Sequence, residues 1–285
     1  MTKQLKDLNL LDRFLFAEAM EDADNMKDIL DIILGQDTVL KCLPQTEKES
    51  RTSPMNRFVK LDVCAWDEDD TVYDTEVQKE NTHNLPRRSR LYQGIIDSKL
   101  LPPGTADFNN LNDVFIILIT PFDLFGYDLY RYTFRMECEE VPGLKLADGA
   151  TRIFLNTRGK NPENVSPELI ELLHYMETST DEVSQNCKSD RIHEMHRRVN
   201  RIKSSEEIGV KFMQAWEEKI LDKRKAHEEG YNLGRSAGRE QLLQEQIKKK
   251  LEKGYTPEEI AAFLEEDIGE VKRLIKQIQS DDQMK

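Results

Sequence analysis

Two short segments in which apolar and polar residues alternate constrain the fold of this chain more than any other feature. They span residues 58–66 and 72–78, and the acidic run 67–70 separates them. Side chains on a β-strand point alternately to its two faces, so each segment predicts a strand with one buried face. Acidic and other polar residues suit a tight turn. The sequence therefore predicts an antiparallel β-hairpin.

The register of this hairpin follows from the same pattern. A turn centred on Asp69 places the apolar side chains of both segments on one face and sets Asp62 opposite Glu76 on the other. A slip of one residue would turn the apolar side chains of one strand to the wrong face, so the pattern favours this register. The further pairs expected are Leu61 with Val77, Val63 with Thr75, Ala65 with Tyr73, Lys60 with Gln78, and Cys64 with Asp74.

Three carboxylates, those of Asp62, Asp74 and Glu76, share the polar face of the hairpin. Like charges on neighbouring strands repel each other, so this cluster calls for a nearby cation. Hard oxygen ligands suit Mg²⁺ or Mn²⁺. The alternative is an ordinary acidic surface in contact with water, because the chain is acidic throughout and short motifs often match by chance. The hairpin alone leaves both interpretations open.

The composition narrows the class of protein. The chain has 285 residues, a net charge of −13 and a mean hydropathy of −0.67, which indicate a soluble, acidic protein. Such a charge argues against non-specific wrapping of nucleic acid. No apolar run approaches the length of a membrane span, and "VFIILITPF" suits a buried strand instead. The N-terminal segment "MTKQLKDLNLLD" lacks the apolar core of a signal peptide.

The cysteines indicate a reducing compartment. The four of them show no CxxC spacing, so neither a disulfide framework nor a zinc site is expected. Reduced thiols in the cytoplasm are the simplest interpretation. We therefore expect a cytoplasmic protein that does not associate with a membrane.

Local patterns place further helices and strands along the chain. Capping residues and amphipathic periodicity predict helices at 7–20, 24–34, 86–101 and 166–177, and a helical region from Arg191 onward. Strands are expected at 38–43, 113–120, 127–137 and 151–156, and a polar linker at 178–190. This order predicts an α/β core built on one mixed sheet with helices on its faces.

Three stretches resemble the PD-(D/E)XK nuclease family transposases, also called recombination-promoting nucleases. They are "KLDVCAWDEDDTVYDTEVQKE", "RRSRLYQGIIDSKLLPPGTADFNNLNDVFIILITPFDLFG" and "DGATRIFLNTRG". The resemblance implies a restriction-endonuclease-like mixed sheet flanked by helices, with an all-helical C-terminal extension, and cleavage of DNA with Mg²⁺ or Mn²⁺. The regions expected are a nuclease-like domain at 1–178, a helical linker region at 179–229, and a glycine-spaced helix with a small helical tail at 230–285.

The same resemblance assigns roles to the acidic residues. In that superfamily an Asp, and a Glu-X-Lys motif on the next strand, hold the metal ion and activate water. Asp62 matches the Asp and Glu76 matches the Glu, whereas Gln78 stands where the Lys is expected. An acidic residue of the first helix often completes the site. Asp12 in "LLDRF" is the best match, and Glu18 is the alternative.

Gln78 changes the chemistry expected of the motif. An amide can orient water through hydrogen bonds, but it neither acts as a base nor adds positive charge. Because the expected register places Lys60 opposite Gln78, we hypothesise that Lys60 supplies the missing ammonium group. The alternative is that Lys60 pairs with acidic residues at the surface.

A basic segment after the hairpin suits contact with the DNA backbone. Arg87, Arg88 and Arg90 lie at the start of an expected helix, where guanidinium groups and free backbone amides both bind phosphate. Lys79 is a further candidate. The alternative is that these arginines form salt bridges in an acidic protein.

The C-terminal region carries weaker patterns. His193 and His196 could suggest metal ligands, but a solvated basic helix face is the interpretation we favour. Gly230, Gly234 and Gly238 predict a flexible linker, or else close packing between helices of two copies. The last segment resembles a small helix-turn-helix with a packing or partner-binding role.

Together these observations predict a metal-dependent DNA endonuclease tied to a mobile element or to recombination. DNA is the expected partner, and the C-terminal helices are the surface through which copies of the chain would form a homo-oligomer. The alternative is a nuclease fold with weakened catalysis, which binds DNA or protein partners through its helical tail.

Overall fold

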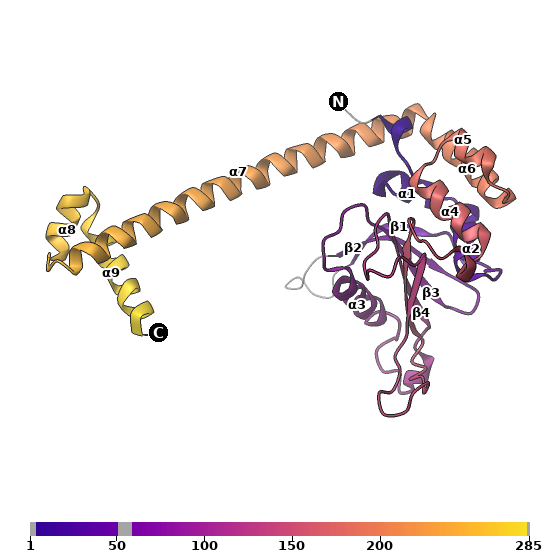
Figure 1. Cartoon of the computed structure of the whole chain (residues 1–285), viewed down its shortest axis with the longest axis horizontal. Helices are drawn as coiled ribbons and strands as arrows, with labels where there is room; N and C mark the ends of the chain where they lie inside the picture. The colour runs from indigo at the N-terminus through magenta and orange to yellow at the C-terminus, as the bar shows by residue number, and fades with distance from the viewer. Residues whose placement is uncertain (1–3, 51–58, 284–285) are drawn as a thin grey trace. The chain divides into compact units, whose positions relative to one another are not determined.

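The structure is a computed structural model of the chain, and it describes residues 4–50 and 59–283. The chain forms two compact units, Met1–Phe212 and Met213–Lys285 (Figure 1). Within the described ranges, no helix is both long and apolar enough to cross a lipid bilayer.

A mixed sheet of six strands forms the centre of the first unit. The strands are β1 (Gln45–Ser50), β2 (Val59–Trp66), β3 (Val72–Val77), β4 (Val114–Thr120), β5 (Arg131–Phe134) and β6 (Ala150–Asn156). Their order across the sheet is β1-β2-β3-β4-β6-β5. The pairs β3–β4 and β4–β6 are parallel, and the other pairs are antiparallel. The α/β architecture with one mixed sheet, expected from the sequence, is confirmed.

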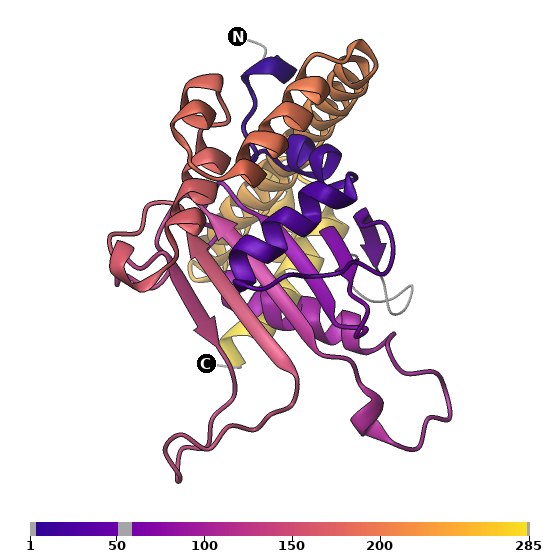
Figure 2. The same cartoon turned by 90° about the vertical axis from the view of Figure 1, so that its right-hand side faces the viewer.

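Helices cover both faces of this sheet (Figure 1 and Figure 2). Helix α3 (Leu85–Asp97) packs on one face over a core that includes Cys64 and Ile116. The helices that pack on the opposite face are α1 (Arg13–Met20), α2 (Ala23–Leu34), α4 (Pro167–Glu177), α5 (Asp181–Asn186) and α6 (Asp190–Lys203). Ile116 and Ile117 of β4 enter opposite cores, which explains why this strand is apolar throughout. Short 3-10 helices lie at Leu5–Asp7, Phe108–Asn110 and Pro162–Asn164.

The predicted hairpin is formed by β2 and β3. Its register is confirmed for the pairs of the regular ladder, which are Val63–Thr75, Cys64–Asp74, Ala65–Tyr73 and Trp66–Val72. Asp67 organises the turn, because its Oδ1 accepts hydrogen bonds from the amides of Asp69 at 3.1 Å and Thr71 at 2.8 Å. The pair expected between Leu61 and Val77 is wrong, since Leu61 packs in the core under α3 and Val77 in the opposite core.

Two elements near the N-terminus differ from the expectation. The first long helix begins at Arg13 rather than at residue 7, because Asp12 caps it by accepting a hydrogen bond from the amide of Phe14 at 3.2 Å. The strand expected at 38–43 is wrong, and that segment forms one isolated bridge to the hairpin turn. The edge strand is β1 instead, whose polar sequence "QTEKES" has no apolar alternation. The remaining predicted elements up to residue 177 are present with shifted ends.

The segment 178–190, expected to be a linker, is folded. It contains α5, which Thr180 caps by accepting a hydrogen bond from the amide of Val183 at 3.4 Å. Val183 and Cys187 of this segment contact the larger core. The polar composition of the segment therefore reflects a short capped helix on the surface of the first unit.

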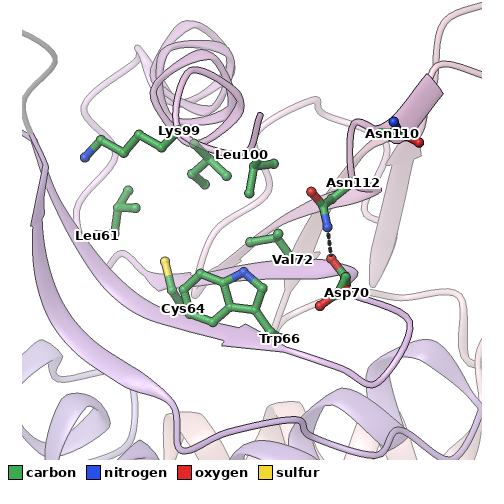
Figure 3. A pocket seen from close by; sticks show the side chains of 10 residues that line it. Leu61, Cys64, Trp66, Asp70, Val72, Lys99, Leu100, Asn110 and Asn112 are labelled. Atoms are coloured by element: carbon green, nitrogen blue, oxygen red, sulfur yellow. Dashed lines mark hydrogen bonds between the residues drawn. The ribbon is translucent and has the colours of Figure 1, made fainter. Parts of the chain in front are cut away.

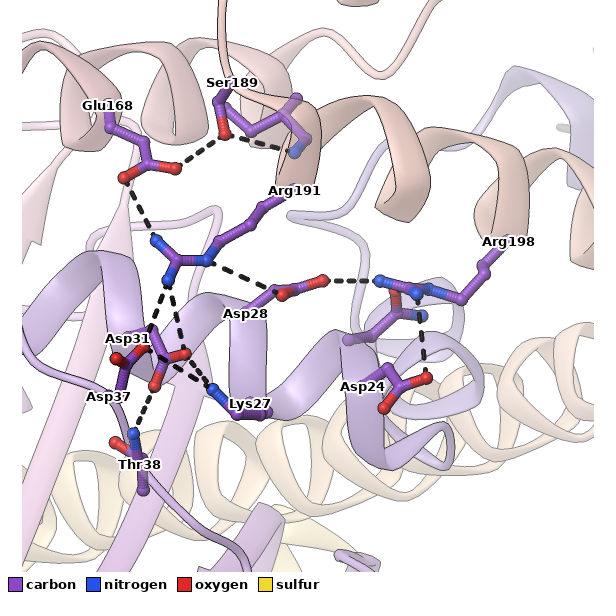
Figure 4. Close-up of polar contacts among 12 residues, drawn as sticks. Asp24, Lys27, Asp28, Asp31, Asp37, Thr38, Glu168, Ser189, Arg191 and Arg198 are labelled. Carbon is purple, nitrogen blue, oxygen red and sulfur yellow. Dashed lines mark hydrogen bonds and ion pairs between the residues drawn. The ribbon is translucent and has the colours of Figure 1, made fainter.

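Arg191 and Arg198 of α6 connect this helix to α2 and α4 (Figure 4). Arg198 Nη2 contacts Asp28 Oδ2 at 2.5 Å, and Arg191 Nη1 lies 3.4 Å from Oε2 of Glu168. Arg191 Nη2 also lies 3.7 Å from Oδ2 of the buried Asp31. Burial raises the pKa of Asp28, while Arg198 opposes this shift. The basic face of α6 is therefore fixed to the first unit by ion pairs and is not simply solvated.

His196 is buried, so a solvated position is wrong for this residue. Its Nδ1 lies 2.9 Å from the hydroxyl of Tyr175, and its Nε2 lies 2.7 Å from Oδ1 of Asp181. His193 Nε2 lies 3.0 Å from the carbonyl oxygen of Cys187. Both imidazoles thus have structural partners that join α4, α5 and α6.

Helix α7 (Glu206–Leu251) begins in the first unit and ends in the second. It passes through Gly230, Gly234 and Gly238 as one continuous helix, so the flexible linker expected there is wrong. A β-carbon added at any of these glycines would meet no atom within 4 Å in the described part of the chain, apart from the helix's own nearby backbone. No close packing within the described residues therefore requires glycine at these positions.

The second unit is a small helical bundle. The end of α7 packs with α8 (Pro257–Leu264) and α9 (Ile268–Gln283) around a core that includes Ile247, Ile260 and Leu274. Thr256 and Glu259 form a capping box at the start of α8. The helical C-terminal extension expected from the sequence is confirmed.

Candidate active site

The carboxylates of Asp62 and Glu76 lie where the regular ladder between β2 and β3 ends. The amide of Asp62 donates to Oε1 of Glu76 at 2.8 Å, and the amide of Val77 donates to Oδ2 of Asp62 at 3.2 Å. Each carboxylate thus accepts a hydrogen bond from the backbone of the other strand. Both residues are 2% exposed. Two acidic side chains therefore converge between the strands.

A third carboxylate, that of Asp74, is completely buried beside this pair. Its Oδ1 accepts a hydrogen bond from the thiol of Cys64 at 3.7 Å, whereas its Oδ2 has no hydrogen-bond partner among the described residues. Burial, and after it the charge of Asp62, raises the pKa of Asp74 to about 8. Burial, followed by the charges of Asp74 and Asp62, raises the pKa of Glu76 well above its ordinary value. A solvated acidic surface is therefore the wrong interpretation.

Two arginines face these carboxylates from two different helices. Arg13, the first residue of α1, forms an ion pair between its Nε and Oδ1 of Asp62. Arg88, in the first turn of α3, places Nη2 3.5 Å from Oε2 of Glu76. The charge of Arg88 partly opposes the upward pKa shifts of Asp74 and Glu76. Arg13 was not among the site residues predicted from the sequence, although its place directly after the helix-capping Asp12 in "LLDRF" could have indicated it.

Gln78 supports the position of Arg88. Its Oε1 accepts a hydrogen bond from Nη1 of Arg88 at 3.0 Å, and its Nε2 donates to the carbonyl oxygen of Glu80 at 2.8 Å. Both ends of the amide are therefore engaged. The positive charge that a motif Lys would bring on β3 is here brought to Glu76 by a guanidinium group on α3.

Asp12 and Lys79 lie beside each other at the margin of the site. Nζ of Lys79 is 3.6 Å from Oδ2 of Asp12, and Asp12 also caps the helix that carries Arg13. Glu18, the alternative to Asp12, forms an ion pair with Lys211 of α7 instead. Asp12 is thus the first-helix acid that lies next to residues of the site.

The three arginines of "RRSR" differ in their surroundings. Arg88 is half-buried against Glu76 and Gln78, as the salt-bridge alternative predicted for the segment. Arg87 and Arg90 are exposed on the same helix, and neither forms an ion pair within the described part of the chain. These two side chains face solvent.

A family model described as "PD-(D/E)XK nuclease family transposase" matches residues 11–230. The chain belongs to this family. The match includes the whole sheet and every residue of the acidic cluster, so the family resemblance expected from the sequence is confirmed. Comparisons with curated proteins and with solved structures found no match.

As a PD-(D/E)XK nuclease family transposase, the protein has a restriction-endonuclease-like α/β fold, with six strands in a mixed sheet and helices on both faces. Membership indicates a nuclease associated with transposition, and such a nuclease has DNA as its substrate. PD-(D/E)XK nucleases generally use divalent metal ions.

The acidic cluster fits a divalent ion in its chemistry. Among the side chains that the structure describes, no three His, Cys, Asp or Glu are arranged to hold a metal ion. However, Asp62, Asp74 and Glu76 are buried hard-oxygen ligands, and the pKa values of Asp74 and Glu76 are raised by burial and mutual repulsion. A cation among them would favour their charged forms. Arg13 and Arg88 bind oxygens of the same carboxylates.

Lys60 lies on β2, where its backbone pairs with Glu49 of β1. Its side chain lies outside the described part of the structure. The hypothesis that its ammonium group replaces the motif Lys therefore stays a prediction.

Proposed function

We propose that this PD-(D/E)XK nuclease family transposase is a metal-dependent DNA endonuclease, which hydrolyses phosphodiester bonds in connection with a mobile element or with DNA recombination. The observation that carries the proposal is the convergence of Asp62 and Glu76, buried and joined through backbone hydrogen bonds at the end of the hairpin ladder. Buried carboxylates with raised pKa values are typical of functional sites.

Asp62 and Glu76 are the proposed ligands of Mg²⁺ or Mn²⁺, with Asp12 as the proposed third acid. Bound there, a divalent ion would supply a water of lowered pKa and would stabilise the charge that develops on the phosphate. The chain's own residues would hold and orient the reacting groups. We propose that Gln78 positions Arg88, and that Arg88 then exchanges its contact with Glu76 for one with the DNA phosphate.

Arg87, Arg90 and Lys79 are the proposed contacts to the DNA backbone away from the cleaved bond. Arg87 and Arg90 are exposed on the helix that carries Arg88, which supports this role. If Arg88 binds one phosphate, the neighbouring phosphates of the same DNA strand would lie within reach of these two side chains. Lys79 follows Gln78 directly and contacts Asp12.

Plasmid nicking tests the proposal. The wild-type protein should nick supercoiled plasmid in Mg²⁺ or Mn²⁺ and not in EDTA, and Asp62→Asn and Glu76→Gln should each lower the rate about 100-fold or more. The matched control is Asp69→Asn, which removes an exposed carboxylate from the turn of the same hairpin and should leave the rate unchanged. Nicking that persists in EDTA or in both site variants would contradict the proposal.

The second candidate is a nuclease-fold module with weakened catalysis, which binds DNA or protein partners through its helical tail. The observation that favours it is the engagement of both ends of the Gln78 amide by Arg88 and Glu80, which leaves this residue less suited to orient water than a motif Lys. Binding of DNA without nicking, in both metals, would support this candidate over the first.

We also infer a cytoplasmic location and a homo-oligomer joined through α7. Within the described residues none of the four cysteines forms a disulfide, which suits a reducing compartment. Residues 221–239 of α7 are exposed on every side, and they include large apolar side chains such as Leu221 and Leu233. Such a helix gains stability when a second helix covers it.

A further inference from the structure

A cavity of about 500 Å³ lies under the end of α3, the helix that also carries Arg88 of the candidate site (Figure 3). Its lining comes from β2, the hairpin turn, β3, the end of α3 and the connection that follows α3. The lining residues include Cys64, Trp66, Asp70, Lys99, Asn110 and Asn112.

The lining combines one aromatic plane with amides, one ammonium group and the carboxylate of Asp70, which forms an ion pair with Lys41. In Figure 3 the indole of Trp66 and the sulfur of Cys64 rise from β2, and Lys99 and Leu100 lie across the cavity from them. Asn112 donates its Nδ2 to the carbonyl oxygen of Asp70 at 2.7 Å, which orients the amide and leaves its oxygen as an acceptor. A flat ring can stack on the indole while its polar edge meets an amide.

This combination suits a nucleobase better than a purely apolar or a purely anionic ligand. Aromatic side chains stack on the faces of unpaired bases, and amides bind the polar edges of bases. A purely apolar ligand would leave Asn112 and Asn110 without partners in the cavity. A small anion would find one lysine in a protein whose net charge is −13.

The cavity adjoins the acidic cluster of Asp62, Asp74 and Glu76 through β2. Cys64 lines the cavity, and its thiol donates to Oδ1 of Asp74 at 3.7 Å. Trp66 is four residues from Asp62, which corresponds to about 13 Å along a strand. A DNA strand in a duplex advances about 3.4 Å per nucleotide, so this distance corresponds to about four nucleotides, or fewer if the strand is extended.

We propose that this cavity binds one unpaired base of the DNA strand that is cut, stacked on Trp66 within a few nucleotides of the cleaved bond. The proposal rests on the proposed function, because DNA is its ligand. A base inside a duplex cannot reach the cavity, so single-stranded DNA, or duplex DNA with an unpaired base, binds more tightly than regular duplex. Trp66 is therefore the residue that makes the protein prefer DNA with an unpaired base over regular duplex DNA.

Tryptophan fluorescence tests the proposal directly, because Trp66 and Trp216 are the two tryptophans of the chain. Trp216→Phe leaves Trp66 as the single reporter. Titration of this variant with a single-stranded oligonucleotide in EDTA, where metal-dependent cleavage cannot interfere, should quench the fluorescence. Regular duplex of the same sequence should quench it less, and deoxyadenosine monophosphate should quench it only at much higher concentration.

Affinity measurements by fluorescence anisotropy of labelled DNA complete the test. Trp66→Leu should weaken binding of the single strand about 5- to 150-fold, the range given by about 1–3 kcal/mol for one stacked base. Trp216→Leu is the matched control and should bind as the wild type does. Asn112→Ala, a milder change in the same cavity, should weaken binding in the same direction if Trp66→Leu fails to fold.

Abasic oligonucleotides separate base binding from backbone binding. Removal of one base within about four nucleotides of the cleavage position should weaken binding, while removal of a distant base should not. The proposal is overturned if bound DNA leaves Trp66 fluorescence unchanged, if every abasic strand binds like the intact one, or if the free nucleotide binds as tightly as the strand. Quenching by DNA without any nicking in metal would support an unpaired base in the cavity, but it would reject the endonuclease and with it the position of that base relative to a cleaved bond.

Discussion

At the scale of single residues, the site depends on carboxylates that are held together despite their repulsion. Asp62 and Glu76 each accept a backbone hydrogen bond from the opposite strand, which stabilises their charged forms. Asp74 has no such backbone donor, and burial together with the charge of Asp62 raises its pKa to about 8. Burial and the neighbouring charges also raise the pKa of Glu76 well above its ordinary value, so in the absence of a metal ion both Asp74 and Glu76 hold a proton more tightly than ordinary carboxylates do.

The raised pKa of Asp74 predicts how stability depends on pH. The folded protein binds the proton of Asp74 more tightly than the unfolded chain does. Protonation of Asp74 therefore contributes fully to the free energy of unfolding below the ordinary pKa of 3.8, and this contribution is lost as pH rises to about 8. Urea unfolding in EDTA should show the wild type losing stability across this window. Asp74→Asn should lose less over the same window. Parallel curves for the two proteins would contradict the assignment.

Arg88 predicts a second pH effect, on activity. Its positive charge lowers the pKa values of Asp74 and Glu76 toward their ordinary range. Arg88→Met should therefore move the acid side of the pH profile for Mn²⁺-dependent nicking to higher pH, besides lowering the rate. Arg87→Met, at an exposed position of the same helix, should weaken DNA binding without moving the profile. An unshifted profile in Arg88→Met would show that Arg88 does not control these carboxylates.

At the scale of helices and strands, the sequence predicted what depends on local periodicity. The alternation on both sides of the acidic turn was sufficient for the hairpin register from Val63 to Trp66. It could not show that the strands separate at Asp62, because that depends on hydrogen bonds between side chains and the opposite backbone. It could not show Arg13 at the site either, since the packing of α1 against the sheet brings it there.

Other elements were missed for a related reason. Strand β1 is polar and joins the sheet through backbone pairing with β2, so its side chains carry no periodic pattern. Helix α5 has six residues, too few for an amphipathic pattern to stand out. Three glycines predicted a flexible linker inside α7, because each costs about 1 kcal/mol relative to alanine in a helix. The helix nevertheless continues through all three of them.

The ion pairs between α6 and α2 predict a stability effect at this scale. Arg198 is mostly buried and binds both Asn25 and Asp28, so Arg198→Met should lower the free energy of unfolding by about 2–3 kcal/mol. Arg197→Met, one residue earlier, removes an exposed arginine that pairs with Glu194 and should change stability by less than about 0.5 kcal/mol. Urea unfolding of both variants measures the difference. Equal effects would mean that the network does not fasten α6.

At the scale of the whole molecule, the proposed homo-oligomer depends on α7. Its exposed segment carries Tyr231 and Leu233 beside glycines at which an added β-carbon would meet no atom within 4 Å in the described chain, apart from the helix's own nearby backbone. The full chain should therefore be an oligomer in light scattering, and a truncation after Lys225 should be monomeric. An unchanged oligomer in the truncated protein would place the contact in the first unit instead.

The central claim is that Asp62 and Glu76 hold one divalent ion, and Mn²⁺ binding measured by electron paramagnetic resonance tests it most directly. The wild type and the control Asp69→Asn should bind one Mn²⁺ ion per chain with the same affinity. Asp62→Asn and Glu76→Gln should each lose this binding while keeping a wild-type circular dichroism spectrum. Undiminished Mn²⁺ binding in both folded variants would contradict the claim.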